Sequence, residues 1–594
     1  MNDKPKSVWT RPWQGWRKKF VWLALVAVTI FVILLGLGLA SAESHNPAEH
    51  ILPALGLALG ISLLITVIVW FIRWLRCWRN FKRFLFGLAC LITLFALFYA
   101  VENFRGHRAW EKYRQAGEAL GEKFDVASIA PPSVPDEQNF AMQPLWVEEI
   151  SGMMGMEKAR TWYGEKVAAL GHTNRVRPLE MPIELYGQQL EQTNRTGNWQ
   201  IAEKTDLAIW QTYYRHLATI TNHFPVGTAP QKPAADVLLA LSKYDKAIQE
   251  LRTISSLPHA RFPVRYSDEN PAMILLPHLA SLKGCTTTLK LRALAELQSD
   301  QADQALADIK LMSRLNDAVR IEPFLISHLV SIAMLNIQLQ PIWEGLADHR
   351  WNEAQLIALD AELEKLDFLA AYHFAMLGER AFGCGIVDYL RRNRNEFATI
   401  GWAFEDFNSP PPDHFQAFIA YATPSGWFEQ NKISICQIHA DYFSQLINLQ
   451  TRTYALAVVT NATASHQKRL TSAHPYNWFP RLLLPALSKA SEKFVQGQAS
   501  TDFARVAIAL ERYRLAHGQF PESLDAIAPK FIANLPHDII TGQPLKYRRT
   551  DDGSFILYSV GWNETDDGGT VGLSKEGKNV DFKKGDWVWR YPAK

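Results

Sequence analysis

The sequence has few cysteines, and none of them form a paired motif. Only five cysteines occur among 594 residues, and no Cys-x-x-Cys motif is present. This excludes a small disulfide-stapled scaffold and argues against a zinc knuckle or a dithiol redox site. Cys77 and Cys90 lie in or beside apolar runs. The other three, Cys285, Cys384 and Cys436, allow at most one disulfide, and the sequence leaves its pairing open.

The sequence also lacks the local motifs of common catalytic sites. Neither the zinc-binding pattern H-E-x-x-H nor the serine nucleophile turn G-x-S-x-G occurs. Residues 572–578 approach phosphate-loop spacing, but Asn579 replaces the hydroxyl residue that binds magnesium, so we interpret them as an exposed loop. His278 and His537 each follow a proline, and we interpret both as hydrogen-bonded structural histidines. The sequence therefore identifies no catalytic residue.

Basic residues are concentrated at one end of the chain. The net charge is +3, yet residues 1–83 hold eleven Lys and Arg against three Asp and Glu, so the remainder is mildly acidic. A protein that binds nucleic acid needs a basic face on its main body. We therefore exclude nucleic acid as a partner.

Three long apolar runs contain no Asp, Glu, Lys or Arg. They are residues 20–42, 52–72 and 84–101. Each is close to the roughly 20 residues that a helix needs to cross the hydrocarbon core of a bilayer. The sequence therefore predicts three transmembrane helices within 20–101.

The charges beside these runs predict their orientation. The tail 1–19 and the loop 73–83 are basic, whereas 43–50 contains no Lys or Arg. The positive-inside rule places the N-terminus in the cytoplasm and the main body in the periplasm, with the helices in the inner membrane. Residues 40–42 resemble a signal-peptidase site. The run before them is long for a signal peptide, so we expect a retained helix, and cleavage after Ala42 stays open.

The pattern beyond the apolar runs is mainly helical. Residues 102–142 combine a juxtamembrane helix with a proline-rich spacer, and 143–498 are predicted to form a large, irregular α-helical domain in the periplasm. The clearest unit is an αα-hairpin over 291–312, with turn and N-cap residues at 299–300. A capping box is predicted to begin another helix at Asn352.

Residues 499–594 change character and predict a small α+β domain. An amphipathic helix ends at Gly518, which suits a helix C-cap. Two β-rich runs follow, 545–548 and 555–560, and the turn sequence Asp-Asp-Gly at 551–553 joins them as a hairpin. The whole chain is thus expected to be mainly α, with this α+β domain at its C-terminal end.

The order of these C-terminal segments resembles a known family. The carriers are ALERYRLAHGQFPESL, LPHDIITGQPLKYR, FILYSVGWNETDDGG and VDFKKGDW. Together they resemble the C-terminal domain of the major pseudopilin of type II secretion systems, over 499–594 alone. The resemblance implies a pseudopilin-like fold and an association with a secretion or pilus-type assembly. The whole arrangement resembles large membrane-anchored proteins of planctomycete and verrucomicrobial type, which imply no activity.

A cluster of oxygen-bearing side chains near the C-terminal end predicts a metal site. Asn563, Asp566, Asp567, Asp581 and Asp586 lie among glycines, and calcium takes six to eight hard oxygen ligands from such flexible loops. The pseudopilin resemblance implies a structural calcium here, with Asn563 and Asp581 at the positions of two loop aspartates. An amide at Asn563 brings no charge and would weaken the site. The alternative is a polar turn without metal.

These observations together predict a non-enzymatic, membrane-anchored periplasmic scaffold that binds other envelope proteins. The alternative is an envelope hydrolase whose site is assembled from residues far apart in the sequence. A transporter or channel component is a weaker alternative, because transport paths usually need ionisable groups at membrane depth and the three runs have none.

Overall fold

The protein is mainly helical with a small C-terminal sheet region, which confirms the predicted fold class in outline. The computed structural model describes residues 67–170, 197–220, 224–396, 421–456 and 474–592 except 485, 486, 488, 576 and 578, together with 26, 28, 30, 32, 60, 64 and 458. The chain divides into two compact units, 1–101 and 102–594. Each is described by itself.

The described part of the first unit is helical. Residues 67–75 are helical, and α3 (Trp78–Ala119) begins in this unit and continues into the second. A strongly apolar stretch of α3 is entirely unburied, so this helix is long and apolar enough to cross a membrane. The predicted run 84–101 lies within α3. The predicted runs 20–42 and 52–72 lie mostly outside the described residues.

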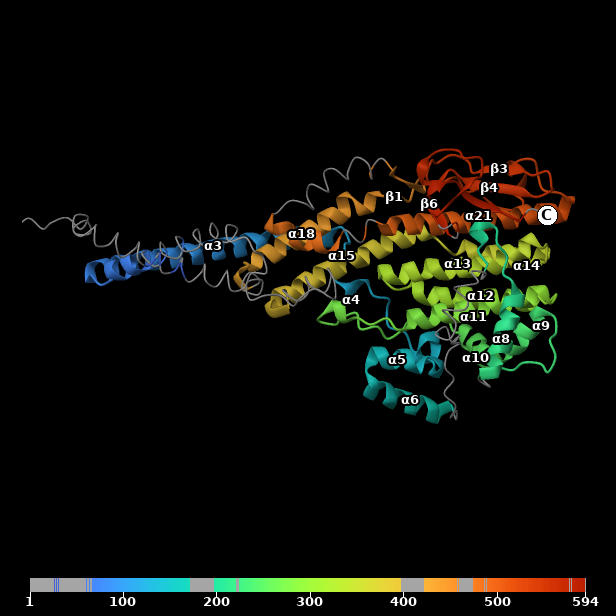
Figure 1. Cartoon of the computed structure of the whole chain (residues 1–594), viewed down its shortest axis with the longest axis horizontal. Coiled ribbons are helices and arrows are strands. Elements are labelled where there is room, and N and C mark those ends of the chain that lie inside the picture. The colour runs from blue at the N-terminus through green and yellow to red at the C-terminus, as the bar shows by residue number, and fades with distance from the viewer. Residues whose placement is uncertain are drawn as a thin grey trace, which may run out of the picture. The chain divides into compact units, whose positions relative to one another are not determined.

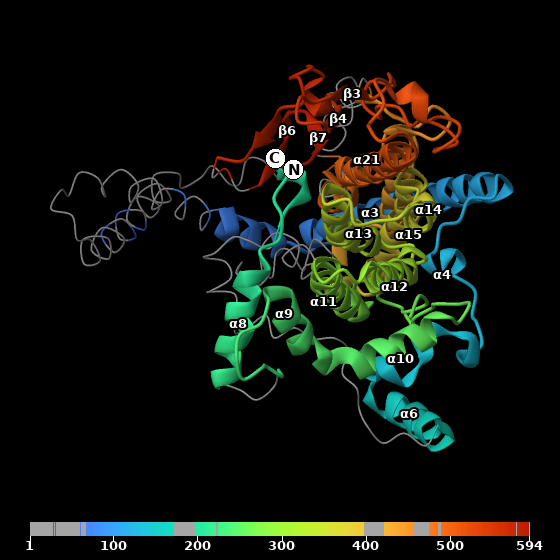
Figure 2. The same ribbon diagram turned by 90° about the vertical axis from the view of Figure 1, so that its right-hand side faces the viewer.

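The second unit is built around the apolar helix α13 (Leu325–Ala347). This helix is also long enough to span a membrane, but 61% of its most apolar stretch is buried inside the protein, which is typical of a core helix. Its neighbours are α11 (His278–Gln298), α12 (Ala302–Arg320) and α21 (Ala490–His517). Figure 2 shows these helices nearly end-on, with α21 between α13 and the C-terminal strands.

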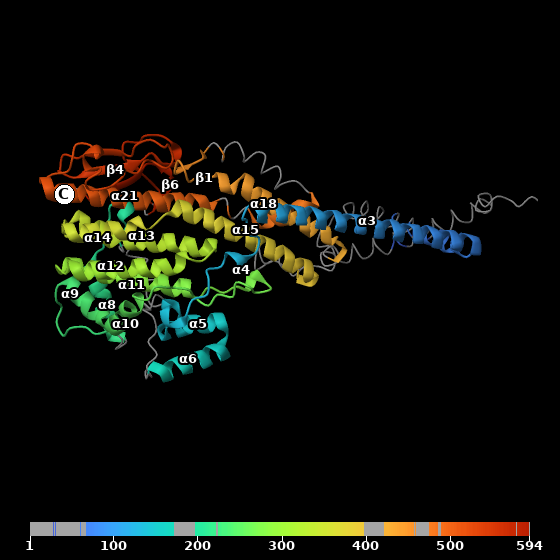
Figure 3. The ribbon, with the colours of Figure 1, turned by 180° about the vertical axis from the view of Figure 1, so that it is seen from behind.

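Further helices surround this group in the second unit (Figures 1 and 3). α4 packs against α15, and α15 packs against both α18 and α21. Their bounds are α4 (Val126–Ile129), α5 (Val147–Met154), α6 (Met156–Leu170), α8 (Leu207–Ile220), α9 (Pro233–Leu241), α10 (Asp245–Ser255), α14 (Glu353–Glu364), α15 (Phe368–Arg392), α18 (Ser425–Asp441) and α20 (Trp478–Leu483).

Two helical features predicted from local sequence are confirmed. α11 and α12 form the αα-hairpin, and Asn352 and Gln355 form the capping box of α14. The capping chemistry of the hairpin turn differs from the prediction. Gln301 occupies the N-cap position of α12 without a side-chain hydrogen bond. Asp300 instead adopts a left-handed backbone conformation (φ 59°) and pairs with Arg350, so it serves the turn and not the cap.

The C-terminal strands form the predicted hairpin and extend it. β3 (Lys546–Arg549) pairs antiparallel with β4 (Phe555–Ser559), and β7 (Trp587–Arg590) adds to the other edge of β4. β5 (Val571–Leu573) and β6 (Val580–Gly585) form a separate antiparallel pair. Every second side chain of a strand points to the same face, and the aromatic side chain of Trp589 fills the core beneath β7.

The helix α21 joins this sheet region to the helical body. It ends where predicted, because Gly518 has φ 81° and donates its N–H to the Arg514 carbonyl at 2.7 Å. It begins earlier than predicted, at Ala490, and its buried side chains include Phe494 and Phe503 on either side of position 499. The expected domain 499–594 therefore shares its longest helix with the body.

The last part of α3 packs tightly against α18 within the second unit. A Cβ atom built on Gly106 would lie 2.2 Å from the carbonyl oxygen of Gly426, so the two helices cross with their backbones in contact. Beside this crossing the Glu102 carboxylate is buried. It accepts hydrogen bonds from the Trp427 indole at 2.9 Å and from the Tyr476 hydroxyl at 2.7 Å.

Candidate functional site

The loop after β4 and the residue just before β7 bring together three of the five predicted metal ligands. Asp586 is fully buried, and its carboxylate accepts hydrogen bonds from the backbone amides of Asp567 at 3.3 Å and Gly569 at 2.7 Å. The amide nitrogen of Asn563 donates to the Asp567 carboxylate at 2.8 Å. Burial raises the pKa of Asp586 above its ordinary value, although these two amides oppose the shift.

The other two predicted ligands have separate partners. Asp566 accepts a hydrogen bond from the Tyr558 hydroxyl at 3.0 Å and pairs with Lys546. Asp581 lies on β6 and pairs with Lys584 at 3.0 Å. Within the part of the chain that the structure describes, no three His, Cys, Asp or Glu side chains are grouped so as to hold a metal ion. Direct hydrogen bonds and ion pairs therefore account for these side chains.

Calcium binding by this loop stays a prediction. It is tested on the full-length protein, because a fragment that starts at residue 499 would divide α21 (Ala490–His517). Bound calcium stabilises only the folded state, so a chelator is expected to lower the melting temperature and added calcium to restore it. Magnesium serves as the control, because it demands a stricter octahedral geometry. An unchanged melting temperature would contradict calcium binding and would mean that hydrogen bonds and ion pairs alone stabilise the loop.

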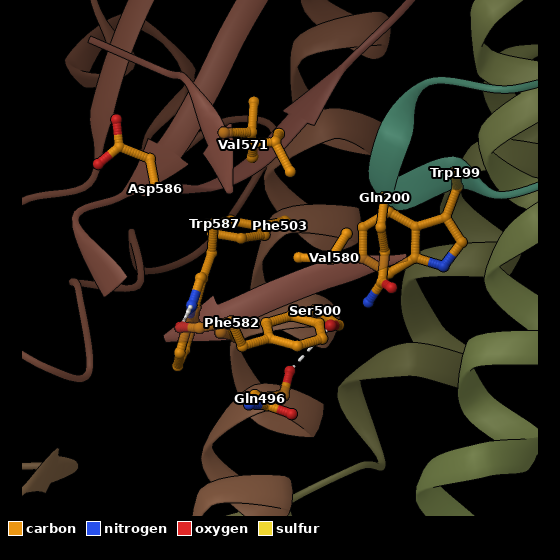
Figure 4. A pocket seen from close by; sticks show the side chains of 12 residues that line it. Trp199, Gln200, Gln496, Ser500, Phe503, Val571, Val580, Phe582, Asp586 and Trp587 are labelled. Atoms are coloured by element: carbon orange, nitrogen blue, oxygen red, sulfur yellow. Dashed lines mark hydrogen bonds between the residues drawn. The ribbon is translucent and has the colours of Figure 1, made fainter. Parts of the chain in front are cut away.

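A small pocket beside this loop is too narrow for a ligand. It lies between α21, β6 and Trp199, and its volume of about 20 Å³ is enough for little more than one water molecule. Asp586 is one of its lining residues, and Figure 4 shows the Asp586 carboxylate pointing away from the other labelled side chains. The Trp587 indole donates to the Phe582 carbonyl at 3.1 Å, which closes one wall.

A much larger cavity lies on another side of α21. Its volume is about 430 Å³, within the range of small-molecule sites. The walls are the end of α14, the start of α15, the turn between the short strands β1 (Ile447–Asn448) and β2 (Thr453–Tyr454), α21, and the segment 532–539. Its charged and titratable lining residues are Glu364, Asp367, Arg452, Asp502, Arg505 and His537.

An ion pair between Asp367 and Arg452 forms one wall of the cavity. Asp367 is the N-cap of α15 and accepts from the backbone amides of Leu369 and Ala370. The Arg452 guanidinium donates to both of its oxygens, at 2.9 and 3.4 Å. Burial alone would raise the pKa of Asp367, but these donors bring it below its ordinary value. Asp367 is therefore an ionised carboxylate at neutral pH.

Asp502 on α21 has the opposite character. Burial raises its pKa to about 7, and the nearby negative charge of Asp367 adds to the shift. A hydrogen bond from the Gln498 amide at 2.9 Å opposes the shift only in part. One carboxyl group of the cavity thus holds a proton near neutral pH while the other is ionised, which is the pairing that acid–base chemistry requires.

Two further basic side chains complete the lining. Arg505 on α21 donates to Asp360 and Glu364, each at 2.8 Å, so its guanidinium is held rigidly at the rim. His537 contributes a ring whose Nε2 is shielded from solvent and has no hydrogen-bond partner among the residues described. The prediction of a hydrogen-bonded structural histidine therefore does not fit this nitrogen of His537.

The predicted hydrogen bond is also not formed by His278, because neither of its ring nitrogens makes a hydrogen bond of good geometry with the residues described. This ring is fully buried, stacks on Phe262 with ring centroids 4.2 Å apart, and places Nε2 2.8 Å from the carboxylate of the buried Glu322. Such a closed pair has no access to a ligand, so His278 has a structural role.

Known proteins offer no guide to this cavity. Comparison of the chain with protein-family models, with curated proteins and with solved structures finds no match. The resemblance of 499–594 to major pseudopilins therefore stays a prediction.

The cavity leaves little local signal in the sequence, because its lining residues come from five separate segments. Asp502 lies within a helical stripe, Arg452 in a turn, and Asp367 in a position that N-capping already explains. The one local signal is the His537 that follows Pro536 at an element edge. A second concentration of buried charge lies in the α10–α12 region, where Arg252 pairs with Asp308 and Arg292 pairs with Glu296.

Proposed function

We propose that the protein is a non-enzymatic, membrane-anchored binding protein whose cavity takes a small ligand carrying both a positive and a negative charge, such as a short peptide. The observation that carries this proposal is the 430 Å³ cavity lined by two arginines together with carboxyl groups. α3 supports the membrane anchor, because its apolar stretch is unburied and has the length of a membrane span.

The charges of the lining favour a ligand of mixed charge. Arg452 and Arg505 offer guanidinium groups, which suit a carboxylate, while Asp367 and Glu364 offer acceptors for an ammonium group. Each arginine already pairs with a carboxylate. A ligand with only a negative charge that took over an arginine would therefore leave that carboxylate without a positive partner, and a purely positive ligand would do the same to the arginine. A zwitterion can place its carboxylate on the arginine and its ammonium group on the carboxylate of the same pair.

The placement of the body and its protein partners are also proposals. The basic residues of 1–19 and 73–83 support an inner-membrane protein with a cytoplasmic N-terminus and a periplasmic body. A role as a scaffold for other envelope proteins in a secretion or pilus-type assembly is supported by the sequence resemblance of 499–594 alone.

The ligand proposal is tested with two matched variants of α21 in the full-length protein. Arg505→Gln removes a guanidinium from the cavity rim, whereas Arg512→Gln removes one that pairs with Glu353 two helical turns away, outside the cavity. The probes are di- and tripeptides, compared with an uncharged disaccharide. We expect peptides to raise the melting temperature of the wild type and of Arg512→Gln, with at least tenfold weaker binding by Arg505→Gln. Equal responses of both variants would remove the proposal.

A hydrolase is the second candidate, and the opposed protonation of Asp502 and Asp367 favours it. A protonated Asp502 could give its proton to a leaving group while the ionised Asp367 acts as base or stabilises positive charge. Chromatography of the protein–peptide mixtures used for the melting measurements distinguishes a hydrolase from a binding protein. Cleavage products that disappear with Asp502→Asn would favour the enzyme, and intact peptides would favour binding alone.

A further inference from the structure

Two of the three cysteines outside the apolar runs meet in the core. Cys384 lies on α15 and Cys436 on α18, and their sulfur atoms are 3.6 Å apart although the residues are 52 positions apart in the chain. Both side chains are buried, at 2% and 0% exposure. Cys285 lies on α11 in a different part of the core, so it does not compete for this pairing.

The packing around the two sulfur atoms is tight and comes from three segments. Trp110 of α3 and Phe124 form one small core cluster with both cysteines. At the neighbouring position on α15, a Cβ atom built on Gly383 would touch the side chain of Ile435 at 3.5 Å, so α15 and α18 lie close together here. A disulfide needs an S–S distance of about 2.05 Å, so the two sulfur atoms must move closer together to form the bond.

We propose that Cys384 and Cys436 form a disulfide that joins α15 to α18 beneath the end of α3. Two thiols lose two protons and two electrons, and the acceptor is a disulfide-bearing oxidant protein that leaves as a dithiol. One cysteine attacks the oxidant to form a mixed disulfide, and the other then displaces the oxidant thiol. The hydrogen bond between the two thiols and their burial raise the pKa of Cys384 in the folded protein, so we expect the reaction to occur during folding, before the pair is enclosed.

The disulfide in the cell depends on the proposed periplasmic placement, because thiols stay reduced in an ordinary cytoplasm. The test therefore uses the full-length protein from two hosts, an ordinary strain and a strain with an oxidising cytoplasm. Free thiols are blocked with N-ethylmaleimide at lysis. Trypsin cleaves after Arg380, Arg391, Lys432 and Arg452, so the disulfide would link peptides 381–391 and 433–452 in the mass spectrum.

The outcomes separate the pairing from the placement. We expect the linked peptides from both hosts, and their loss in Cys384→Ser but not in Cys285→Ser. Linked peptides from the oxidising host alone would support the pairing and overturn the periplasmic body. Alkylated Cys384 and Cys436 from both hosts would overturn the pairing. Reduction of the wild type is expected to lower its melting temperature by several degrees, because the disulfide restricts the unfolded chain.

Discussion

Replacement of Gly426 by alanine is expected to destabilise the second unit by about 3 kcal/mol, near the upper end of the cost of overfilling a packed site. The added Cβ would lie 2.0 Å from the Glu102 carbonyl oxygen and 2.7 Å from its carbon. Both atoms belong to the backbone of α3, so neither can rotate away. The two helices must separate, which also strains the hydrogen bonds of Glu102 to Trp427 and Tyr476.

The measurement is the melting temperature of the purified full-length protein, and Gly284→Ala is the matched control. Gly284 also lies inside a helix of the second unit, α11, but a Cβ there meets no atom within 4 Å. Alanine at Gly284 is expected to leave stability unchanged or to raise it by about 0.5–1 kcal/mol, because glycine is a poor helix former. If the two variants melt alike, α3 and α18 do not cross with their backbones in contact.

Replacement of Asp502 by asparagine is expected to stabilise the protein at alkaline pH and not at acid pH. The folded protein holds the proton of Asp502 up to a pKa of about 7, whereas the ordinary value of an aspartate is 3.8. Between these two values the folded state binds more protons than the unfolded state, so the stability from Asp502 is complete below about pH 4 and is lost as the pH rises through 7. Asparagine does not titrate and avoids this loss.

The gain from Asp502→Asn can reach about 4 kcal/mol, since one pKa unit corresponds to about 1.4 kcal/mol. Denaturant unfolding of both proteins is compared at about pH 3, 6 and 8. The pair at pH 3 serves as the internal control, because the Asp502 carboxyl is then mostly protonated in both the folded and the unfolded state. A difference that does not change with pH would show that Asp502 is not buried as an acid. Loss of peptide binding in the same variant would connect this proton to the cavity.

Local signals in the sequence were enough to predict the features that depend on neighbouring residues. The Asp-Asp-Gly turn between β3 and β4, the Gly518 cap of α21 and the capping box of α14 each require only a few adjacent residues, and each is confirmed. The start of α21 differs from the prediction, because the helix begins at Ala490 and not near residue 499. Its first turns contain the polar residues Ser491, Gln496 and Gln498, which are buried and so do not follow the apolar stripe from which a helix is predicted.

The features that depend on tertiary structure were beyond prediction from one sequence. Nothing in the sequence favours a pairing of Cys384 with Cys436 over a pairing of either with Cys285. Only the packing of α15 on α18 brings the sulfur atoms of Cys384 and Cys436 together. Burial raises the pKa of both Asp367 and Asp502, but the hydrogen bonds from Arg452 and two backbone amides outweigh it at Asp367. At Asp502 the Gln498 hydrogen bond and the arginine charges do not outweigh it. The burial of these carboxyl groups and their distances from the arginines depend on how separate segments pack, so the spacing of residues in the sequence does not reveal them.

The length of α21 has a consequence for how this protein can change in evolution. An α-helix turns about 100° per residue, so inserting one residue near position 498 would rotate everything beyond it by that angle about the helix axis. The side chains that face α13 and those that face the strands would then lose their partners on one side or the other. Only insertions close to a whole number of turns, such as seven residues, would keep both faces of the helix directed at their partners. We therefore expect homologues to vary in the lengths of the loops around α21 but not in the length of α21 itself.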